Sequence, residues 1–514
     1  MIPAAGEAFN AGGELSARAA ARGDEPVYRC EGRSVSGRAL VELVLASQRA
    51  LAREGLSSGD RVLLVLRDTP AFVAAFLGAL RAGVIPVPVS TLLPPKDVAF
   101  IAQDSGARTA LVDAALASEV PPSAFPAGVT RIVVGREGFE GLGDPGGDAP
   151  PAAPTQADDA AFLLYTSGTS GAPKGVVHRH ADLRATAECY ARAVLGVGPG
   201  DRLLSAAKLF FAYGLGNGLT FPLWLGAEAV LHPGRPSPEE IFGLVEREQP
   251  TIFFGVPTLY ATLLAHPSLP HSLGRIRLCV SAGEALPPVL LERWRDRFGV
   301  EVLDGLGSTE MLHIFVSSRP GSARPGSSGT PVPGYSVRVV DEAGRDVAEG
   351  DVGTLLAAGP SAATAYWNRR DETATTMFAP GWLRTGDSVR RDADGFLYHE
   401  GRTDDLLKVS GIFVSPFEVE ATLLEHEAVA EVAVVARTDE LGLVKPCAFV
   451  VPKAGAEPGS ALARALQTLV KQRLAPHKYP RWIAFRDALP KTATGKIRRH
   501  DLRAWAAALR EEAS

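Results

Sequence analysis

The chain has few cysteines and no long apolar stretch. Its 514 residues include four cysteines, which form no Cys-x-x-Cys pair and have no histidine close enough to complete a zinc pattern. We therefore expect reduced, structural thiols. No apolar run approaches the roughly 20 residues that span a bilayer, and the first residues lack the basic and apolar parts of a secretory signal. These absences predict a cytoplasmic protein without a membrane span.

The chain also lacks an excess of charge of either sign. It has 53 basic and 58 acidic side chains, a net charge of −5, and the signs are mixed along the sequence. Because no basic stripe stands out, we expect no nucleic-acid partner. The 46% of hydrophobic and 22% of charged residues are ordinary for globular proteins. The length allows more than one domain.

Helical and strand patterns alternate over most of the chain. Leu40, Leu43, Val44 and Leu51 share one face of a predicted helix, and the apolar run 62–66 follows it. Similar apolar runs occur at 84–89, 109–112, 131–134, 227–231, 251–255 and 277–281. The alternation predicts an α/β fold built on a large, mostly parallel sheet system.

A second, smaller domain is predicted near the C-terminus. The segment 401–405 follows the turn-rich residues 392–395, and shorter mixed patterns begin after it. We divide the chain into a large domain, 1–403, and a small α+β domain, 404–514. In the small domain we expect helices at 416–426 and 460–474 and strands at 432–435, 447–451 and 482–485.

The most informative segment is rich in glycine and hydroxyl side chains and reads TSGTSGAPKG, residues 166–175. Its glycines let backbone N–H groups turn inward around Lys174, and its hydroxyls add donors, which makes a cradle for an anion. It follows the apolar run 161–165, so we expect it at the carboxyl end of a strand in an open α/β sheet. A flexible linker is the alternative. The cradle residues are Thr166, Ser167, Gly168, Thr169, Ser170, Gly171 and Lys174.

The spacing of this cradle differs from that of a Walker P-loop. That motif needs two glycines five positions apart followed by Lys-Ser or Lys-Thr. Here Gly168 is followed five residues later by Pro173, and Gly171 by Val176. Kinases and GTPases of the Walker class are therefore disfavoured.

Two further segments carry groups that a nucleotide requires. Asp387 follows a turn glycine and can accept from a ribose diol, and Arg402 can reach a ribose or an α-phosphate oxygen. Glu310 is a candidate Mg²⁺ ligand, with Thr309 donating to phosphate. Each carboxylate has a structural alternative: Asp387 caps a turn, or Glu310 caps a helix that begins near Met311.

Together these segments resemble the adenylate-forming superfamily, which includes acyl-CoA synthetases, firefly luciferase and the adenylation domains of peptide synthetases. The likeness is greatest to benzoate-CoA ligases and covers nearly the full chain. It rests on the phosphate cradle and on the runs FFAYGLG (210–216), SAGEALP (281–287), GSTEMLHIF (307–315), DLLKVSG (405–411) and PKTATGK (490–496).

The resemblance implies roles in the predicted small domain. Lys496, which by itself reads as a solvated loop lysine, matches the lysine that bridges the substrate carboxylate and the α-phosphate. Asp404 matches the hinge about which the small domain rotates. Lys408, Ser410 and Gly411 match the passage for the pantetheine arm of coenzyme A, although Ser410-Gly411 alone reads as a turn.

The resemblance also implies an adenine site. Many members of the superfamily have an aromatic residue that stacks on adenine where this chain has Leu306, and leucine lacks the aromatic quadrupole. Small residues on the opposite wall allow close backbone approach. The predicted adenine residues are Gly283, Glu284, Ala285, Asp304, Gly305 and Leu306.

The acid is expected to bind in a slot lined by aromatic and small residues, although such a mixture also suits ordinary core packing. None of the candidates carries a fixed charge unless His313 is protonated, which favours a neutral ring over a dicarboxylate or an amino acid. His313 is either a satisfied core histidine or a hydrogen-bond partner for an ortho amino or hydroxyl group. The slot candidates are Ala212, Tyr213, Gly307, Ser308, His313 and Ile314.

We therefore expect a two-step aryl-CoA ligase that uses ATP, Mg²⁺ and coenzyme A. Benzoate or a small substituted benzoate, such as 2-aminobenzoate, gives an aryl-adenylate and pyrophosphate, and then the aryl-CoA thioester. The alternatives are an adenylation enzyme that loads a carrier protein in trans, a luciferase-like oxidative enzyme and a non-catalytic nucleotide-binding protein. A homodimer and a monomer are both compatible with the sequence.

Overall fold

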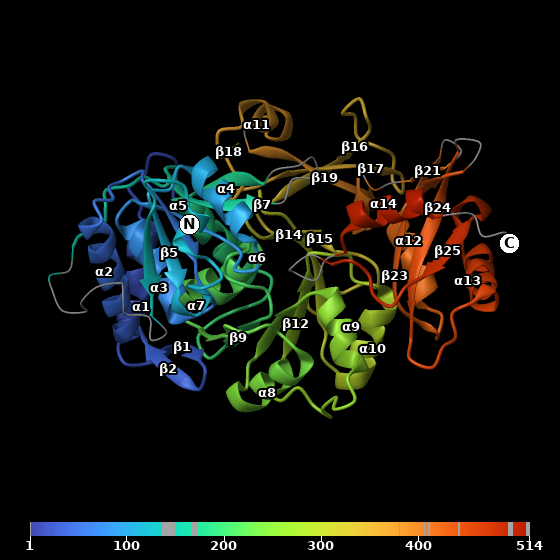
Figure 1. Cartoon of the computed structure of the whole chain (residues 1–514), viewed down its shortest axis with the longest axis horizontal. Helices are drawn as coiled ribbons and strands as arrows, with labels where there is room; N and C mark the ends of the chain where they lie inside the picture. Colours follow the sequence, from blue (N-terminus) through green and yellow to red (C-terminus); the bar gives the residue numbers. More distant parts are fainter. Residues whose placement is uncertain are drawn as a thin grey trace.

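The computed structural model describes residues 2–135, 148, 150–166, 173–379, 381–403, 405, 407–409, 412–439, 443–491 and 497–509. Figure 1 shows the chain up to β20 (Leu397–Arg402) on the left and in the centre, and the chain from α12 (Pro416–Leu424) onward at the right. The hydrophobic clusters follow the same division. Among the described residues, no cluster contains side chains from both before residue 398 and after residue 406. The predicted arrangement of a large and a smaller domain is confirmed.

The largest sheet has nine strands in the order β15-β14-β13-β12-β11-β9-β10-β1-β2. The six strands from β13 to β1 in this order are parallel, and antiparallel strands close both edges. The strands are β1 (Pro26–Cys30), β2 (Arg33–Ser36), β9 (Arg202–Ser205), β10 (Glu228–Leu231), β11 (Ile252–Gly255), β12 (Leu278–Ala282), β13 (Val302–Gly307), β14 (Ile314–Ser317) and β15 (Thr330–Pro331).

Both faces of this sheet are covered, which explains why its central strands are apolar without interruption. In β11, Phe253 packs into one hydrophobic cluster, whereas its neighbours Ile252 and Phe254 pack into another on the opposite face. The first cluster includes side chains of three helices, α8 (Pro238–Glu248), α9 (Pro257–Ala265) and α10 (Pro288–Phe298).

A second parallel sheet has the order β4-β3-β5-β6. Its strands are β3 (Arg61–Val65), β4 (Ile85–Pro88), β5 (Thr109–Asp113) and β6 (Thr130–Val134). The predicted apolar face of α2 (Gly37–Arg53) is buried at Leu40, Leu43, Val44 and Leu51. The other helices before residue 230 are α1 (Ala11–Ala21), α3 (Pro70–Arg81), α4 (Pro95–Ser105), α5 (His180–Thr186), α6 (Ala212–Leu215), α7 (Phe221–Leu225) and two π-helical stretches, η3 (Ala187–Arg192) and η4 (Gly216–Thr220).

The strand before the phosphate cradle does not belong to a parallel sheet, and this expectation was wrong. β7 (Ala160–Thr166) pairs antiparallel with β8 (Lys174–Arg179), and β18 (Ala365–Tyr366) pairs with the other edge of β8. Thr166 lies opposite Lys174, so the cradle joins the two strands of a hairpin. A short apolar run has the same pattern in both kinds of sheet, so the sequence alone does not separate them.

A four-stranded antiparallel sheet carries the segment around Asp387. Its order is β16-β17-β19-β20. The strands are β16 (Ser336–Val340), β17 (Val352–Ala358), β19 (Trp382–Arg391) and β20. The short helix α11 (Arg370–Thr376) precedes β19.

The C-terminal part mixes helices and strands as expected. It contains a two-stranded sheet and a three-stranded sheet in the order β23-β24-β25. The predicted strand 482–485 is β25 (Trp482–Phe485). Both predicted helices begin at the expected residue, and the other ends differ by one to three residues. The remaining elements are β21 (Leu407–Val409), β22 (Ile412–Val414), β23 (Val429–Thr438), β24 (Val444–Pro452), α13 (Ser460–Arg473) and α14 (Arg499–Ala508). Among the described helices, none combines the length and apolar character that crossing a bilayer requires.

Candidate active site

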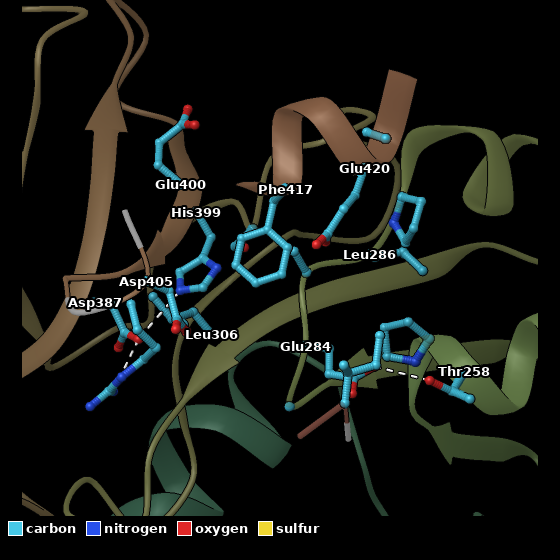
Figure 2. Close-up of a pocket in the computed structure, with 18 of the residues that line it drawn as sticks. Thr258, Glu284, Leu286, Leu306, Asp387, His399, Glu400, Asp405, Phe417 and Glu420 are labelled. Carbon is cyan, nitrogen blue, oxygen red and sulfur yellow. Dashed lines mark hydrogen bonds and ion pairs between the residues drawn. The ribbon is translucent and has the colours of Figure 1, made fainter. Parts of the chain in front are cut away.

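One large cleft, with a volume of about 2350 Å³, is lined by residues from both parts of the chain. Figure 2 shows the side chains of Asp387, His399, Phe417 and Glu420 around it, together with Glu284. Thirteen of the predicted site residues line this one cleft: Thr166, Lys174, Gly283, Glu284, Ala285, Gly305, Leu306, Gly307, Ser308, Thr309, Glu310, Asp387 and Arg402.

Some predicted residues lie outside the described part of the chain. These are Ser167, Gly168, Thr169, Ser170, Gly171, Asp404, Ser410, Gly411 and Lys496. Lys408 lies in β21, opposite Phe413, but its side chain is not described. The residues on either side of the Lys496 segment, Lys491 and Ile497, form an isolated antiparallel bridge, and both line the cleft. The roles of all these residues stay predictions.

Asp387 is a buried carboxylate on β19, with only 5% of its surface exposed. Its Oδ1 atom accepts from Nη1 of Arg402 at 3.2 Å and lies 3.3 Å from Nε2 of His399. Burial alone raises the pKa of this carboxyl, but the hydrogen bond and charge of His399 and the charge of Arg402 hold it below its ordinary value. Asp387 is therefore ionised near pH 7 and faces the cleft as a fixed acceptor.

The turn before Asp387 requires glycine. Gly386 has a φ of +75°, and a Cβ atom there would lie 2.6 Å from Nη2 of Arg402. Arg402 also donates from Nη1 to the carbonyl oxygen of Thr385 at 2.8 Å, and the Thr385 hydroxyl accepts from the backbone N–H of Asp387. The turn and the arginine thus fix the direction of the carboxylate.

Glu310 lies in a turn, and the alternative that it caps a helix near Met311 is wrong. Residues 308–313 form turns and bends without a helix. The Met311 backbone N–H donates to the Ser308 hydroxyl at 3.2 Å, and Leu312 has the unusual φ of +64°. The Tyr366 hydroxyl donates to Oε1 of Glu310 at 2.7 Å. This bond orients the Glu310 carboxylate, which lines the cleft.

Tyr366 also connects the phosphate hairpin to Glu310. It pairs with Val176 of β8, and Nζ of Lys174 lies 5.4 Å from the centroid of the Tyr366 ring. A cation, an aromatic ring and a carboxylate therefore follow one another along the wall of the cleft. This order places a positive group and a candidate Mg²⁺ ligand where a polyphosphate needs both.

Among the described residues, no group of three or more His, Cys, Asp or Glu side chains is arranged to hold a metal ion by itself. A Mg²⁺ ion that arrives with a nucleotide does not need such a group, because phosphate oxygens and water fill most of its positions. The Glu310 carboxylate, fixed by Tyr366, fits this mode of binding.

Two predicted adenine residues differ in their exposure. Leu306 lines the cleft, whereas Asp304 lies behind the wall with 5% of its surface exposed. Burial raises the pKa of the Asp304 carboxyl to about 7, against the lowering effect of a hydrogen bond from the Ser328 hydroxyl to Oδ2 at 2.8 Å. Its Oδ1 atom is buried and has no partner among the described residues.

The six slot candidates divide into two groups. Gly307 and Ser308 line the cleft, whereas the others lie behind its wall. A Cβ atom at Gly307 would lie 2.8 Å from the carbonyl oxygen of His313, so the strand that lines the cleft touches the buried group directly. Of these others, Ala212, His313 and Ile314 are buried, and Tyr213 is half-buried.

His313 is surrounded by aromatic rings and is uncharged. Its ring centroid lies 5.4 Å from that of Tyr213, 5.1 Å from that of Tyr190 and 4.7 Å from that of Phe221. Burial lowers the pKa of His313 to about 3, so no slot candidate carries a charge near pH 7. Its Nε2 atom lies 3.1 Å from Oδ1 of Asn217, whereas Nδ1 is buried without a partner among the described residues. Half of its hydrogen-bonding capacity is thus satisfied by the protein.

The sequence analysis missed three residues of this site. Tyr366 orients Glu310, His399 contacts Asp387, and Asn217 contacts His313. Asn217 directly follows the run FFAYGLG (210–216), and it lies in the π-helical stretch η4, a feature often found at functional sites. For Tyr366 and His399, which stand in ordinary strand sequences, we found no signal in the sequence.

Comparison with known proteins agrees with this geometry. Residues 15–367 match the family described as AMP-binding enzyme, and residues 418–496 match the AMP-binding enzyme C-terminal domain. A benzoate–CoA ligase of Thauera aromatica is 49% identical over 507 residues, which cover 97% of this chain and 96% of that protein.

Two solved structures are similar over nearly their whole length. A benzoate CoA ligase from Burkholderia xenovorans has a TM-score of 0.91 and 47% identity, over 96% of this chain and 100% of that chain. The anthranilate CoA ligase AuaEII, solved in complex with anthranoyl-AMP, has a TM-score of 0.92 and 38% identity, over 98% of both chains. The chain therefore belongs to the AMP-binding enzyme family, the adenylate-forming enzymes that its motifs resemble.

Proposed function

We propose that the chain is an AMP-forming aryl-CoA ligase that acts on benzoate or on a small substituted benzoate such as 2-aminobenzoate. Its co-substrates are ATP, with Mg²⁺, and coenzyme A. The benzoate and anthranilate ligases among its relatives support this class of acid. A cytoplasmic location, as the sequence predicts, fits the supply of both co-substrates.

One observation carries the proposal. A cation, two carboxylates and a guanidinium that the sequence assigned to a nucleotide line a single cleft, although they come from three different sheets or turns. They are Lys174, Glu310, Asp387 and Arg402. The chemistry of this set suits ATP, because a polyphosphate needs cations and a metal ligand and a ribose needs an ionised acceptor.

In the proposed complex, Asp387 accepts from the two ribose hydroxyls and Arg402 lies near the ribose or the α-phosphate. Lys174 and the hydroxyls of the cradle hold the β- and γ-phosphates, which leave as pyrophosphate. When bound, Mg²⁺ neutralises phosphate charge, and Glu310 is the residue that holds it. Thr309 donates to phosphate beside it.

The first step forms an aryl-adenylate. A carboxylate oxygen of the acid attacks the α-phosphorus, an O–P bond forms, and the bond to the pyrophosphate oxygen breaks. Lys496 stabilises the negative charge that develops between the carboxylate and the α-phosphate. The neutral slot behind Gly307 receives the ring of the acid. Its charged carboxylate then points toward the cleft and the nucleotide.

The second step transfers the acyl group. The sulfur of coenzyme A attacks the acyl carbon, the thiol proton leaves, and AMP departs as the acyl–oxygen bond breaks. Rotation about Asp404 exchanges the lysine-bearing face of the small domain for the face with Lys408, Ser410 and Gly411, which opens the passage for pantetheine. The separate hydrophobic clusters on either side of residues 398–406 support a rotation that leaves both cores intact.

A screen for pyrophosphate release tests the proposal. The protein is mixed with MgATP and, one at a time, with benzoate and its amino, hydroxy and halo derivatives. We expect release with at least one of these acids, and thioester formation when coenzyme A is added. Transfer to an aryl carrier protein but not to coenzyme A would indicate the carrier-loading alternative. ATP binding without pyrophosphate release across the whole panel would contradict the proposal.

A further inference from the structure

His178 is a fully buried histidine on the strand that begins with the phosphate-loop lysine. It has none of its surface exposed and stands four residues after Lys174 in β8. Because side chains alternate along a strand, Lys174, Val176 and His178 share one face. The described neighbours of that face include Tyr366, which bonds Glu310, and the backbone of Thr309. The face therefore points toward the turn that carries both predicted phosphate-side residues.

The direct link is a hydrogen bond from the His178 ring to the turn. Nε2 of His178 lies 2.8 Å from the carbonyl oxygen of Thr309, and a carbonyl oxygen only accepts, so Nε2 carries a proton. The same oxygen also accepts from the backbone N–H of Leu312 at 3.0 Å, within the turn. Among the described residues, His178 alone donates a hydrogen bond to this carbonyl from outside the turn.

The ring of His178 is itself held from its other side. Nδ1 lies 3.1 Å from Oδ2 of Asp182, a carboxylate with none of its surface exposed. That carboxylate also accepts from the backbone N–H of Arg179 at 2.9 Å and from Nε of its guanidinium at 3.0 Å. The ring of Phe162 stacks on the imidazole with a centroid distance of 5.2 Å and an angle of 24°. Both the plane and the direction of the imidazole are therefore fixed.

A second set of bonds runs parallel to this link. The Arg179 guanidinium donates to the carbonyl oxygens of Pro360 at 2.8 Å and Ala362 at 3.3 Å. The next residue, Ala363, donates its backbone N–H to the carbonyl oxygen of Glu310 at 2.8 Å. His178 thus links strand β8 directly to the carbonyl of Thr309. Arg179 links the same strand to the carbonyl of Glu310 through the segment 360–363.

We propose that His178 is a positioning residue for adenylate formation: its hydrogen bond to Thr309 sets the turn that carries Thr309 and Glu310 relative to the strand that carries Lys174. The inference rests on the proposed function, because that function assigns Lys174, Thr309 and Glu310 to the same triphosphate. Displacing a reacting group by about 1 Å costs on the order of 10²-fold in rate. Loss of this bond should therefore slow adenylation and spare the second step.

Two substitutions separate the proposed role from simple core packing. His178→Gln keeps an amide N–H near the place of Nε2 and can still donate to Thr309. His178→Asn is shorter and reaches only toward Asp182. We expect His178→Asn to lower the rate of pyrophosphate release by about 10-fold to 100-fold. We expect His178→Gln to stay within about threefold of the wild type, and both variants to convert supplied benzoyl-adenylate to thioester at the wild-type rate.

His180→Gln is the matched control. This second buried histidine stands two residues away, and its Nδ1 accepts from the backbone N–H of Ala11, far from the turn. We expect it to leave pyrophosphate release unchanged, with urea unfolding measured on all three variants. Equal losses in His178→Asn and His178→Gln, or losses in both half-reactions, would overturn the positioning role.

Nitrogen NMR of the wild type provides a test that does not depend on activity. In protein labelled with ¹⁵N histidine, His178→Gln identifies the signals of His178, and we expect a protonated Nε2. An unprotonated Nε2 would overturn the inference whatever the rates of the variants. If the wild type releases no pyrophosphate with any benzoate, the proposed function fails, while this spectrum still reports on the bond between His178 and Thr309.

Discussion

The proposed nucleotide end and the proposed acid end of the site are built on opposite physical principles. At the nucleotide end, Asp387 is ionised and held by Arg402 and His399, and Glu310 is held by Tyr366. At the acid end, the candidates are neutral, packed around the ring of His313. Charged groups are oriented at the nucleotide end before a ligand binds, whereas the acid end offers an uncharged wall of packed side chains.

This difference indicates where selectivity comes from. A network of charged hydrogen bonds is strong but serves every acid equally, because each acid is activated by the same nucleotide. A packed apolar wall gains or loses about 1 to 3 kcal/mol with each methylene-sized change, and a buried polar group without a partner adds a sharper preference. Nδ1 of His313, which is buried and has no partner in the part of the chain that the structure describes, is such a group. We therefore expect the nucleotide end to set the rate and the acid end to set the choice.

The largest expected effect concerns the lysine that joins the two ends. We expect Lys496→Ala to slow adenylation by at least roughly 10²-fold, because it removes a donor that stabilises developing charge. Conversion of supplied aryl-adenylate to thioester should remain. Pyrophosphate release and thioester formation, assayed separately, measure the two steps. Lys491→Ala, which removes a cleft lysine paired with Glu431 at 2.8 Å, is the control. Equal losses in both steps would contradict domain alternation.

Asp387→Asn tests the nucleotide end alone. Replacing a charged hydrogen-bond acceptor costs about 1.5 to 3 kcal/mol, so we expect the KM for ATP to rise roughly 10-fold to 100-fold. The KM for the acid should change little. Steady-state kinetics with each substrate varied in turn measures both constants. Asp394→Asn, an exposed turn residue between β19 and β20, serves as the control. A larger change in the KM for the acid would break the division between the two ends.

The neutrality of the acid end is visible in the pH dependence of stability. Burial lowers the pKa of His313 from 6.5 to about 3, so unfolding takes up a proton below pH 6.5 and the folded state loses stability as the pH falls. Between pH 7 and pH 5 the free energy of unfolding should fall by roughly 2 kcal/mol through this histidine.

His313→Gln keeps a donor toward Asn217 but does not titrate. The free energy of unfolding of this variant, measured with urea, should therefore fall by roughly 2 kcal/mol less than that of the wild type between pH 7 and pH 5. His500→Gln, at an exposed position, should behave as the wild type does. Identical slopes for His313→Gln and the wild type would mean that folding does not shift the pKa of this histidine.

The smallest effect is expected where the chain departs from its superfamily. Leu306→Tyr adds an aromatic ring to the predicted adenine wall, and stacking contributes about 0.5 to 1.5 kcal/mol. We expect a tighter Kd for ATP by about twofold to tenfold in calorimetric titration, with no change in the order of preference among acids. Leu306→Met is the control for size. Weaker binding by the tyrosine variant would show that Leu306 leaves room that adenine needs.

The sequence predicted the nucleotide end more fully than the acid end, for a physical reason. Lys174, Glu310 and Asp387 stand in short runs whose residue types already suggest phosphate, metal and ribose chemistry. Their supports come from far away in the chain: Tyr366 is 56 residues from Glu310, and His178 is 131 residues from Thr309. No local pattern records such a pairing.

The fold was predicted with errors and gaps for a similar reason. The strand before the cradle was expected in a parallel sheet because a short apolar run has the same appearance in a hairpin. The sequence at Glu310 suggested a helix cap because acidic side chains favour the N-termini of helices. At the acid end, the contact between Asn217 and His313 joins residues 96 positions apart and depends on the π-helical stretch η4. Packing of this kind is determined by the whole domain.

The separation of the hydrophobic cores has a consequence for how such enzymes diversify. Among the described residues, no core side chain before residue 398 shares a cluster with one after residue 406. A substitution that reshapes the wall around His313 therefore places no strain on the core of the part that follows Asp404. The choice of acid and the machinery of thioester formation are free to change independently, as two inheritable modules within one chain.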